Sequence, residues 1–294
     1  MNYNHFKEEI FNLLQEKTGH GQKVTLHSIE KNNGLLLDAV SIMGKEERMA
    51  PTIYLSDFYE WFQQGADMEM IADKILEMNR DRRIEEPEIT HASFEDYRRA
   101  RTHICYKLIN FEKNRNLLKS VPYIPYLDLA IVFYYRLEEE ALNGATFLIH
   151  NCNMDTWGVT VDELLADAGM NTSRKLPFTF QGMEELIREM TGEEEPEYPV
   201  KEQMYILTNE NKYFGAAVIL YPHVLSHISR ILGGGFYILP SSIHECILVP
   251  DSGQYTKAEL ETMVKEVNAT QVEADEVLSD SVYYYDRKKD MLMM

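Results

Sequence analysis

Two His-x-Cys triplets are the residues of this sequence whose types and spacing best suit chemistry: His150-Asn151-Cys152 and His244-Glu245-Cys246. Residues two apart on a β-strand face the same side of a sheet. Two neighbouring strands would therefore present two imidazoles and two thiolates, a ligand set suited to tetrahedral Zn²⁺. The spacing C-x₂-C, typical of zinc sites, is absent from the sequence, and a buried cysteine often serves only as a small hydrophobe. No cofactor is therefore predicted, and zinc held by His150, Cys152, His244 and Cys246 is the alternative.

The same side chains also suit nucleophilic catalysis. Cys152 and His150 are a candidate thiol and base, with Asp155 as the group that orients the imidazole. His244 and Glu245 complete the set of candidate catalytic residues. No signature of a cysteine hydrolase surrounds Cys152, so a hydrolase or zinc-dependent enzyme is the second interpretation of these residues.

Three further motifs favour structural roles. His223 and His227 are four apart, but the segment HVLSH lacks the glutamate of a metalloprotease helix, which favours a pair on a helix surface. Gly233–Gly235 follow an expected helix and precede an expected strand, so they indicate a helix end and a tight turn, not a phosphate loop. The acidic runs 138–140 and 193–195 are typical of solvated loops.

The overall charge limits the classes of partner. The chain has 294 residues, with 48 acidic and 29 basic side chains and a formal net charge of −19. Phosphate backbones and anionic membranes repel such a chain, so neither nucleic acid nor a membrane is an expected partner. Three widely spaced cysteines indicate a reducing compartment. The first residues do not form a signal peptide, and no apolar run is long enough to span a membrane, so a cytoplasmic location is expected.

The segment 80–119 differs from the rest of the chain in charge. It contains ten basic and seven acidic residues, which gives a net charge of +3. This segment is a candidate docking surface for an acidic protein partner. The favoured alternative is ordinary helix ion pairs, for example Glu95 with Arg98 or Arg99.

Hydrophobic spacing and turn residues predict the elements of an N-terminal α/β lobe over residues 1–112. The expected elements are a helix over 4–17, strands over 24–29 and 35–43 joined by a turn at Asn33-Gly34, an extended segment over 51–55, helices from Ser56 and over 68–78, and a long helix over 93–110. The Asn-Gly pair is a strong signal for a hairpin.

The C-terminal region, residues 113–294, is expected to alternate strands and helices. The expected strands are 127–137, 145–150, 204–208, 214–220, 236–239 and 243–249. Capping boxes formed by Thr160 with Glu163 and by Thr256 with Glu259 begin two of its helices. The first of these helices is expected to end at Gly169, and the last residues, from Asp286, are expected to fray.

A unit of two strands followed by a helix recurs near 24–64, 127–169, 204–232 and 236–267. Such units predict an α+β fold of mixed but mostly antiparallel strands, arranged in hairpins backed by helices, and not a doubly wound parallel sheet. The two regions form either separate domains or parts of one shared sheet.

Four stretches of the sequence resemble a domain-of-unknown-function family of anaerobic Gram-positive gut bacteria: 50–76, 126–135, 145–171 and 233–251. They include APTIYLSDFYEWF, YLDLAIVFYY, IHNCNMDTWGVTVDELL and GGGFYILPSSIHEC. The resemblance extends over residues 3–286, and strand 129–133 with the helix after it is also loosely similar to another uncharacterised bacterial family. The resemblance implies a cytoplasmic bacterial protein, and it brings no activity, substrate or catalytic residue with it.

The sequence therefore predicts an uncharacterised protein that binds or regulates and does not catalyse. This interpretation depends on the lack of a complete catalytic motif, the many hairpin edges and the basic segment within an acidic chain. An unknown protein is the expected partner. The alternative is the enzyme built around His150, Cys152, His244 and Glu245.

Overall fold

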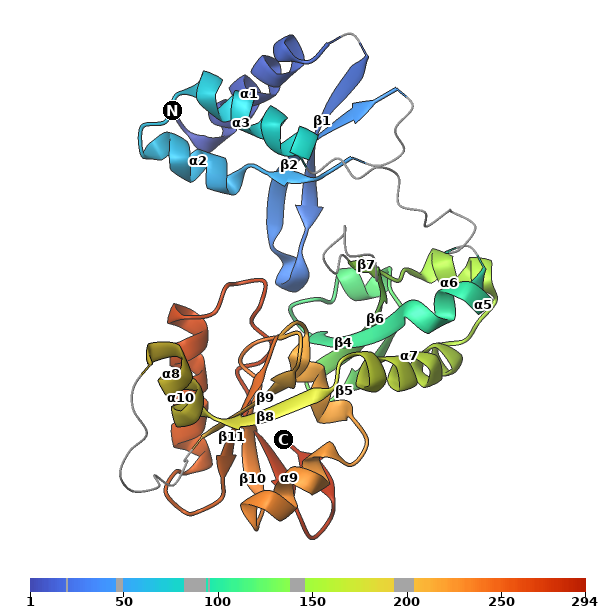
Figure 1. Ribbon diagram of the computed structural model, residues 1–294, viewed down its shortest axis with the longest axis vertical. Coiled ribbons are helices and arrows are strands. Elements are labelled where there is room, and N and C mark those ends of the chain that lie inside the picture. Colours follow the sequence, from blue (N-terminus) through green and yellow to red (C-terminus); the bar gives the residue numbers. More distant parts are fainter. Residues whose placement is uncertain (20, 46–49, 82–93, 95, 138–145, 193–203) are drawn as a thin grey trace. The chain divides into compact units, whose positions relative to one another are not determined.

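The structure is a computed structural model that describes residues 1–19, 21–45, 50–81, 94, 96–137, 146–192 and 204–294. The chain divides into two compact units, Met1–Thr90 and His91–Met294 (Figure 1). Within the described residues every pair of neighbouring strands is antiparallel. The predicted α+β class with mostly antiparallel strands is confirmed.

The first unit is a three-stranded sheet with helices on one face. Its elements are α1 (Tyr3–Lys17), β1 (Gln22–Glu30), β2 (Leu36–Gly44), β3 (Ile53–Tyr54), α2 (Ser56–Gln63) and α3 (Met68–Asp81). The strand order is β1-β2-β3, and Val24 pairs with Ile42 on the face that meets the helices. Phe6 and Ile71 bring α1 and α3 into the same buried cluster. The predicted turn at Asn33-Gly34 is confirmed, with φ angles of 61° and 69°.

The second unit contains two sheets. The first is built around a central strand that pairs with three others, and its strands are β4 (Ile104–Asn110), β5 (Tyr123–Tyr126), β6 (Leu129–Arg136) and β7 (Thr146–Leu148). The central strand is β6, which is buried along nearly all its length. Helices α5 (Tyr97–Ala100), α6 (Asn151–Trp157) and α7 (Val161–Lys175) accompany this sheet. Helix α7 lies along β4, where Thr172 accepts a hydrogen bond from the backbone N–H of Tyr106 at 3.0 Å (Figure 1).

The second sheet has the order β13-β12-β10-β11-β9-β8. Its strands are β8 (Phe178–Gly182), β9 (Tyr205–Asn209), β10 (Phe236–Leu239), β11 (Cys246–Pro250), β12 (Tyr283–Asp286) and β13 (Met291–Met293). Its helices are α8 (Met183–Thr191), α9 (Val224–Leu232) and α10 (Lys257–Thr270), with the short 3₁₀ helix η5 (Gly215–Leu220) before α9. Leu260 and Val264 of α10 pack on Leu239 and Val249 of the sheet.

A hydrogen-bonded carboxylate joins the two sheets of the second unit. Asp128, in the turn between β5 and β6, accepts hydrogen bonds from the hydroxyls of Ser279, Ser281 and Tyr283, at 2.6 Å and 3.0 Å from the two serines. Tyr283 begins β12 and is fully buried. Charge-assisted hydrogen bonds of this kind are stronger than neutral ones, so Asp128 fixes the β5–β6 turn against β12.

The predicted long helix over 93–110 is wrong. Among the described residues 96–110, Tyr97–Ala100 form an α-helix, a 3₁₀ turn follows, and Ile104–Asn110 form strand β4. Both faces of β4 are buried, so its apolar residues run without the alternation that marks a half-exposed strand. Because β4 pairs with β6, it belongs to the second unit, and the predicted boundary at residue 112 is wrong as well.

Three other local predictions are wrong. Residues 214–220, expected as a strand, form the 3₁₀ helix η5, so the unit of two strands and a helix near 204–232 is not formed. Helix α7 continues past Gly169 to Lys175, because the helix packs on β4 there. The expected frayed end contains the hairpin of β12 and β13, where Tyr285 pairs with Leu292.

Both predicted capping boxes are confirmed. Thr160 accepts a hydrogen bond from the N–H of Glu163 at 3.3 Å, and Glu163 accepts one from the N–H of Thr160 at 2.9 Å. Thr256 and Glu259 repeat this arrangement at 3.3 Å and 2.8 Å. These reciprocal bonds satisfy backbone donors that have no partner within the helix.

Candidate functional site

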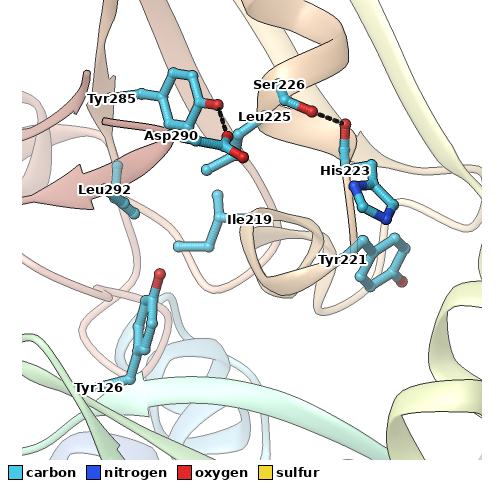
Figure 2. A pocket seen from close by; sticks show the side chains of 9 residues that line it. All are labelled: Tyr126, Ile219, Tyr221, His223, Leu225, Ser226, Tyr285, Asp290 and Leu292. Carbon is cyan, nitrogen blue, oxygen red and sulfur yellow. Dashed lines mark hydrogen bonds between the residues drawn. The ribbon is translucent and has the colours of Figure 1, made fainter. Parts of the chain in front are cut away.

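A small open pocket of about 230 Å³ lies in the second unit (Figure 2). Four segments meet there: the end of β5, the segment from η5 to the start of α9, strand β12 and the β12–β13 turn with β13. The residues that line it are Tyr126, Ile219, Tyr221, His223, Leu225, Ser226, Tyr285, Asp290 and Leu292. Concave sites with a few placed polar groups are the usual location of ligand binding.

The Asp128 network positions two walls of this pocket. Tyr126 precedes Asp128 by two residues, and Tyr285 follows Tyr283 by two residues on β12. Since alternate residues of a strand face the same side, Tyr283 and Tyr285 share a face of β12, where Tyr285 stacks on Phe236, and both are buried. The bond between Asp128 and Tyr283 therefore helps to fix two of the pocket's tyrosines, Tyr126 and Tyr285, relative to each other.

Backbone conformations of low population surround the pocket. Six described residues other than glycine have a positive φ angle, and two of them, His223 (65°) and Asp290 (51°), line the pocket. A third, Leu127 (54°), follows Tyr126 directly. Each such conformation costs on the order of 1 to 3 kcal/mol, and residues of this kind concentrate at functional sites. This clustering indicates a site independently of the pocket's shape.

One wall of the pocket is a hydrogen-bonded tyrosine and carboxylate. The Tyr285 hydroxyl donates to Oδ1 of Asp290 (Figure 2). Burial and then this hydrogen bond raise the pKa of Tyr285 to about 12, so the phenol stays neutral at physiological pH. The pair fixes the Asp290 carboxylate and leaves Oδ2 without a hydrogen-bond partner among the described residues.

The opposite wall carries the phenol of Tyr126, whose hydroxyl points into the pocket (Figure 2). Burial raises the pKa of Tyr126, and the hydroxyl has no hydrogen-bond partner in the part of the chain that the structure describes. By contrast, the Tyr221 hydroxyl donates to the carbonyl oxygen of Leu176 at 2.9 Å, so Tyr221 contributes mainly ring surface. Ser226 donates to the carbonyl oxygen of His223 at 3.0 Å.

The triplet His150-Asn151-Cys152 does not lie on a strand, contrary to the prediction. Strand β7 ends at Leu148, and His150 is the N-cap of helix α6, where Asn153 accepts a hydrogen bond from its backbone N–H at 2.8 Å. By accepting this bond, Asn153 helps to start a helix where the sequence predicted that the strand continues. Cys152 and Asp155 are exposed on α6.

His244 precedes β11, and internal contacts engage both of its ring nitrogens. Its Nδ1 accepts a hydrogen bond from the backbone N–H of Phe214 at 3.3 Å, and its Nε2 lies 3.3 Å from a carboxylate oxygen of Glu276. The ring also stacks on Phe214, with 8° between the planes. Glu245 is half-buried beside it.

Cys246, the first residue of β11, is fully buried. Its sulfur lies 3.9 Å from the carbonyl oxygen of Ala216, and burial raises the pKa of its thiol well above the usual range. A thiol in this environment is disfavoured as a thiolate ligand or nucleophile. Among the described residues, no three His, Cys, Asp or Glu side chains gather so as to hold a metal ion.

The other motifs have structural roles. His223 is the N-cap of α9, and the His227 ring lies 6.3 Å from that of Phe178. Gly233 ends α9 with a φ angle of 81°, which confirms the predicted helix end. The acidic runs 138–140 and 193–195 lie outside the described residues.

Within the basic segment, several arginines form ion pairs with nearby acids. The pairs are Arg98 with Asp96, Arg101 with Asp167 and Arg115 with Glu112, at 3.3, 2.7 and 2.7 Å. These contacts agree with the favoured ion-pair interpretation. Glu95, the acid in the example given for it, lies outside the described residues.

The sequence analysis did not identify the pocket. Tyr126 lies 159 residues before Tyr285 and 164 before Asp290, and no motif joins these segments. The one sequence feature that pointed toward such a pocket was the high tyrosine content, 18 residues, including the run Tyr283–Tyr285. Tyrosine suits sites that are half apolar and half wet.

The fold and the pocket together define an antiparallel α+β protein of two units, the second of which carries a tyrosine-lined pocket. The chain belongs to a family of unknown function, DUF5688, which matches residues 3–287. A comparison with the curated proteins and with the solved structures gave no match. None of the helices in the described ranges has the length and apolar character needed to cross a membrane.

Proposed function

We propose that this protein is a non-enzymatic binding protein and that the pocket of the second unit is its ligand site. The observation that carries the proposal is the pair of polar groups at the pocket that have no partner among the described residues: the Tyr126 hydroxyl and Oδ2 of Asp290. The side chains best able to catalyse are instead exposed, with no catalytic partner in the described part of the chain, as Cys152 is, or engaged internally, as His244 is.

The energetics of the pocket support binding. A half-buried hydroxyl without a protein partner can exchange its hydrogen bond to water for one to a ligand of matching polarity, and such placed groups determine which ligand is preferred. The left-handed backbone conformations of His223 and Asp290 are fixed by the surrounding fold, which supports a site that is formed before binding. A pre-formed site loses little conformational freedom on binding.

The enzymatic alternative uses His150, Cys152, His244 and Glu245, with zinc in its metal-dependent form. A general base needs a ring nitrogen that can reach the substrate, and both nitrogens of His244 have protein partners. The buried Cys246 thiol is a poor zinc ligand for the reason given above. Stoichiometric zinc in natively purified protein would reverse this ranking.

Charge and cysteine content support a cytoplasmic location and argue against nucleic-acid and membrane partners. The formal charge of −19 supports a protein that binds neither nucleic acid nor anionic membranes. The three cysteines form no disulfide, which supports a reducing compartment, hence the cytoplasm. If the protein is regulatory, ligand binding in the pocket would change its affinity for a protein partner.

A blocked pocket tests the proposal directly. Ser226→Trp places an indole at the pocket, and Thr262→Trp places one on the exposed face of α10 as the matched control. Each protein is screened by thermal shift against a panel of small polar metabolites. The proposal expects a stabilising compound for the native chain and for Thr262→Trp, with the effect lost in Ser226→Trp. No stabilising compound, or an equal shift in Ser226→Trp, contradicts it.

A further inference from the structure

We infer that the pocket binds a small amine in its protonated form. The inference rests on the proposed function, because it assigns a ligand class to the same site. Three features of the lining carry it: its charge, its hydrogen-bond acceptors and its size.

The charge of the lining favours a cation. Of the nine residues that line the pocket, Asp290 is the one carboxylate, and neither lysine nor arginine occurs among them. Two of the three basic residues of the adjoining turn are directed to other groups: Lys289 lies 3.5 Å from Asp286, and Arg287 donates to the carbonyl oxygen of Gly233 at 2.8 Å. The third, Lys288, is not among the lining residues. The charge of Arg230 lowers the pKa of Tyr285, but burial and the hydrogen bond to Asp290 raise it by more. An anionic ligand would therefore meet a carboxylate with neither lysine nor arginine among the lining residues to compensate, and the one basic lining side chain is the imidazole of His223.

The hydrogen-bond inventory matches an ammonium group. Oδ2 of Asp290 is a charged acceptor, since Tyr285 occupies Oδ1. The Ser226 oxygen can accept, because its proton is donated to the carbonyl of His223. The Tyr126 oxygen can accept as well. A primary ammonium has three N–H donors and no acceptor, so a lining of hydrogen-bond acceptors that includes a carboxylate suits it better than it suits an anion.

The apolar part of the lining also suits an amine. The rings of Tyr126, Tyr221 and Tyr285 line the pocket, and tyrosine faces attract cations by about 0.5 to 2 kcal/mol, depending on desolvation. Ile219 and Leu292 supply surface for a short hydrocarbon chain. The volume of about 230 Å³ is below that of pockets for drug-sized molecules, so the amine is a small one.

Three probes of equal chain length test the ligand class: putrescine, butane-1,4-diol and succinate. Each is titrated by calorimetry into the full-length protein. The inference expects putrescine to bind at least tenfold more tightly than the diol and expects no binding of succinate. Asp290→Asn removes the charge, and asparagine tolerates the left-handed backbone of this position, so putrescine binding should weaken at least tenfold.

The preceding residue of the same strand, Tyr284, offers a matched control. Tyr284 donates to Asp251 at 2.9 Å, the same chemistry as Tyr285 with Asp290, but on the opposite side of the sheet. Asp251→Asn should leave putrescine affinity unchanged within twofold. Tyr126→Phe, which removes one acceptor and little volume, should weaken binding severalfold and serves as the readout if Asp290→Asn does not fold.

The outcomes separate this inference from the proposed function. Binding of the diol or of succinate as tight as that of putrescine, abolished by Ser226→Trp, overturns the amine inference and leaves the ligand site standing. Equal loss of putrescine affinity in Asp290→Asn and Asp251→Asn overturns it too. Failure of all three probes to bind overturns the amine inference, while the metabolite panel tests the site itself.

Discussion

The Ser279 hydroxyl lies 2.6 Å from Oδ2 of Asp128, although 151 positions separate the two residues in the chain. Ser281 and the buried Tyr283 donate to the same carboxylate. A turn of the first sheet is thereby joined to the start of β12 in the second sheet. The pocket lies beside this connection, since Tyr126 and Tyr285 are each two residues from a member of the network.

Replacing Asp128 should destabilise the second unit strongly. Asp128→Ala deprives three hydroxyls of their charged acceptor, and hydrogen bonds to charged groups contribute about 1.5 to 3 kcal/mol each. These bonds are coupled, so we expect the free energy of unfolding to fall by about 3 kcal/mol, measured by urea denaturation. Asp155→Ala, at an exposed position of α6, is the control and should change it by less than about 0.5 kcal/mol. A loss below about 1 kcal/mol in Asp128→Ala would show that the network contributes little.

Local signals explain which parts of the fold were predictable. Helix α1, the Asn33-Gly34 turn and the capping boxes at Thr160 and Thr256 each depend on residues a few positions apart, and each was predicted correctly. Strand β4 was mistaken for part of a helix, because a strand buried on both faces has no alternation to distinguish it.

The pocket could not be predicted, for a different reason. Its walls come from segments far apart in the chain, held together by the bond between Asp128 and Tyr283, and pairing over 155 positions leaves no local pattern. The left-handed conformations of His223 and Asp290 are also set by tertiary structure, since neither residue is glycine. The sequence shows that Cys246 lies two residues from His244. It does not show that Cys246 is buried, and this burial argues against a metal or catalytic role.

Stability should decline at alkaline pH because of buried tyrosines. Burial raises the pKa of Tyr106, Tyr134, Tyr221 and Tyr283, and at Tyr283 the Asp128 carboxylate adds to the effect. A group whose pKa is higher in the folded state contributes stability that is complete below its unfolded pKa, about 10 for tyrosine, and is lost as pH rises beyond it. We therefore expect the free energy of unfolding to fall steadily above about pH 10.

Denaturation series between pH 8 and 11.5 measure this slope, and tyrosinate absorbance reports which phenols ionise in the folded protein. Tyr283→Phe is expected to be less stable at pH 8, through loss of a hydrogen bond, but to show a shallower alkaline slope. An equal slope in the variant would mean that Tyr283 does not contribute to the alkaline transition.

Two glycines provide a matched test of packing near His244. A Cβ at Gly215 would lie 2.0 Å from Oγ1 of Thr208, 2.4 Å from the carbonyl oxygen of His244 and 2.8 Å from the backbone N of Asn209. Two of these atoms belong to the backbone and cannot rotate away, so Gly215→Ala should lower the free energy of unfolding by at least about 3 kcal/mol. A Cβ at Gly234 meets nothing within 4 Å, so Gly234→Ala should change it by less than about 1 kcal/mol. Equal denaturation midpoints for the two variants would contradict this difference.

The three cysteines should differ sharply in reactivity toward thiol reagents. Cys152 is exposed on α6, whereas Cys105 and Cys246 are fully buried, and burial raises the pKa of the Cys246 thiol. The thiolate is the reacting form, so both access and ionisation disfavour the buried pair. We expect one thiol per chain to react with Ellman's reagent in the folded protein and three in denaturant. Cys152→Ser should abolish the reaction of the folded protein and leave two thiols in denaturant. Reaction of two or more thiols at native rates would show that Cys246 is accessible, and it would return the His244-Glu245-Cys246 triplet to consideration as a reactive site.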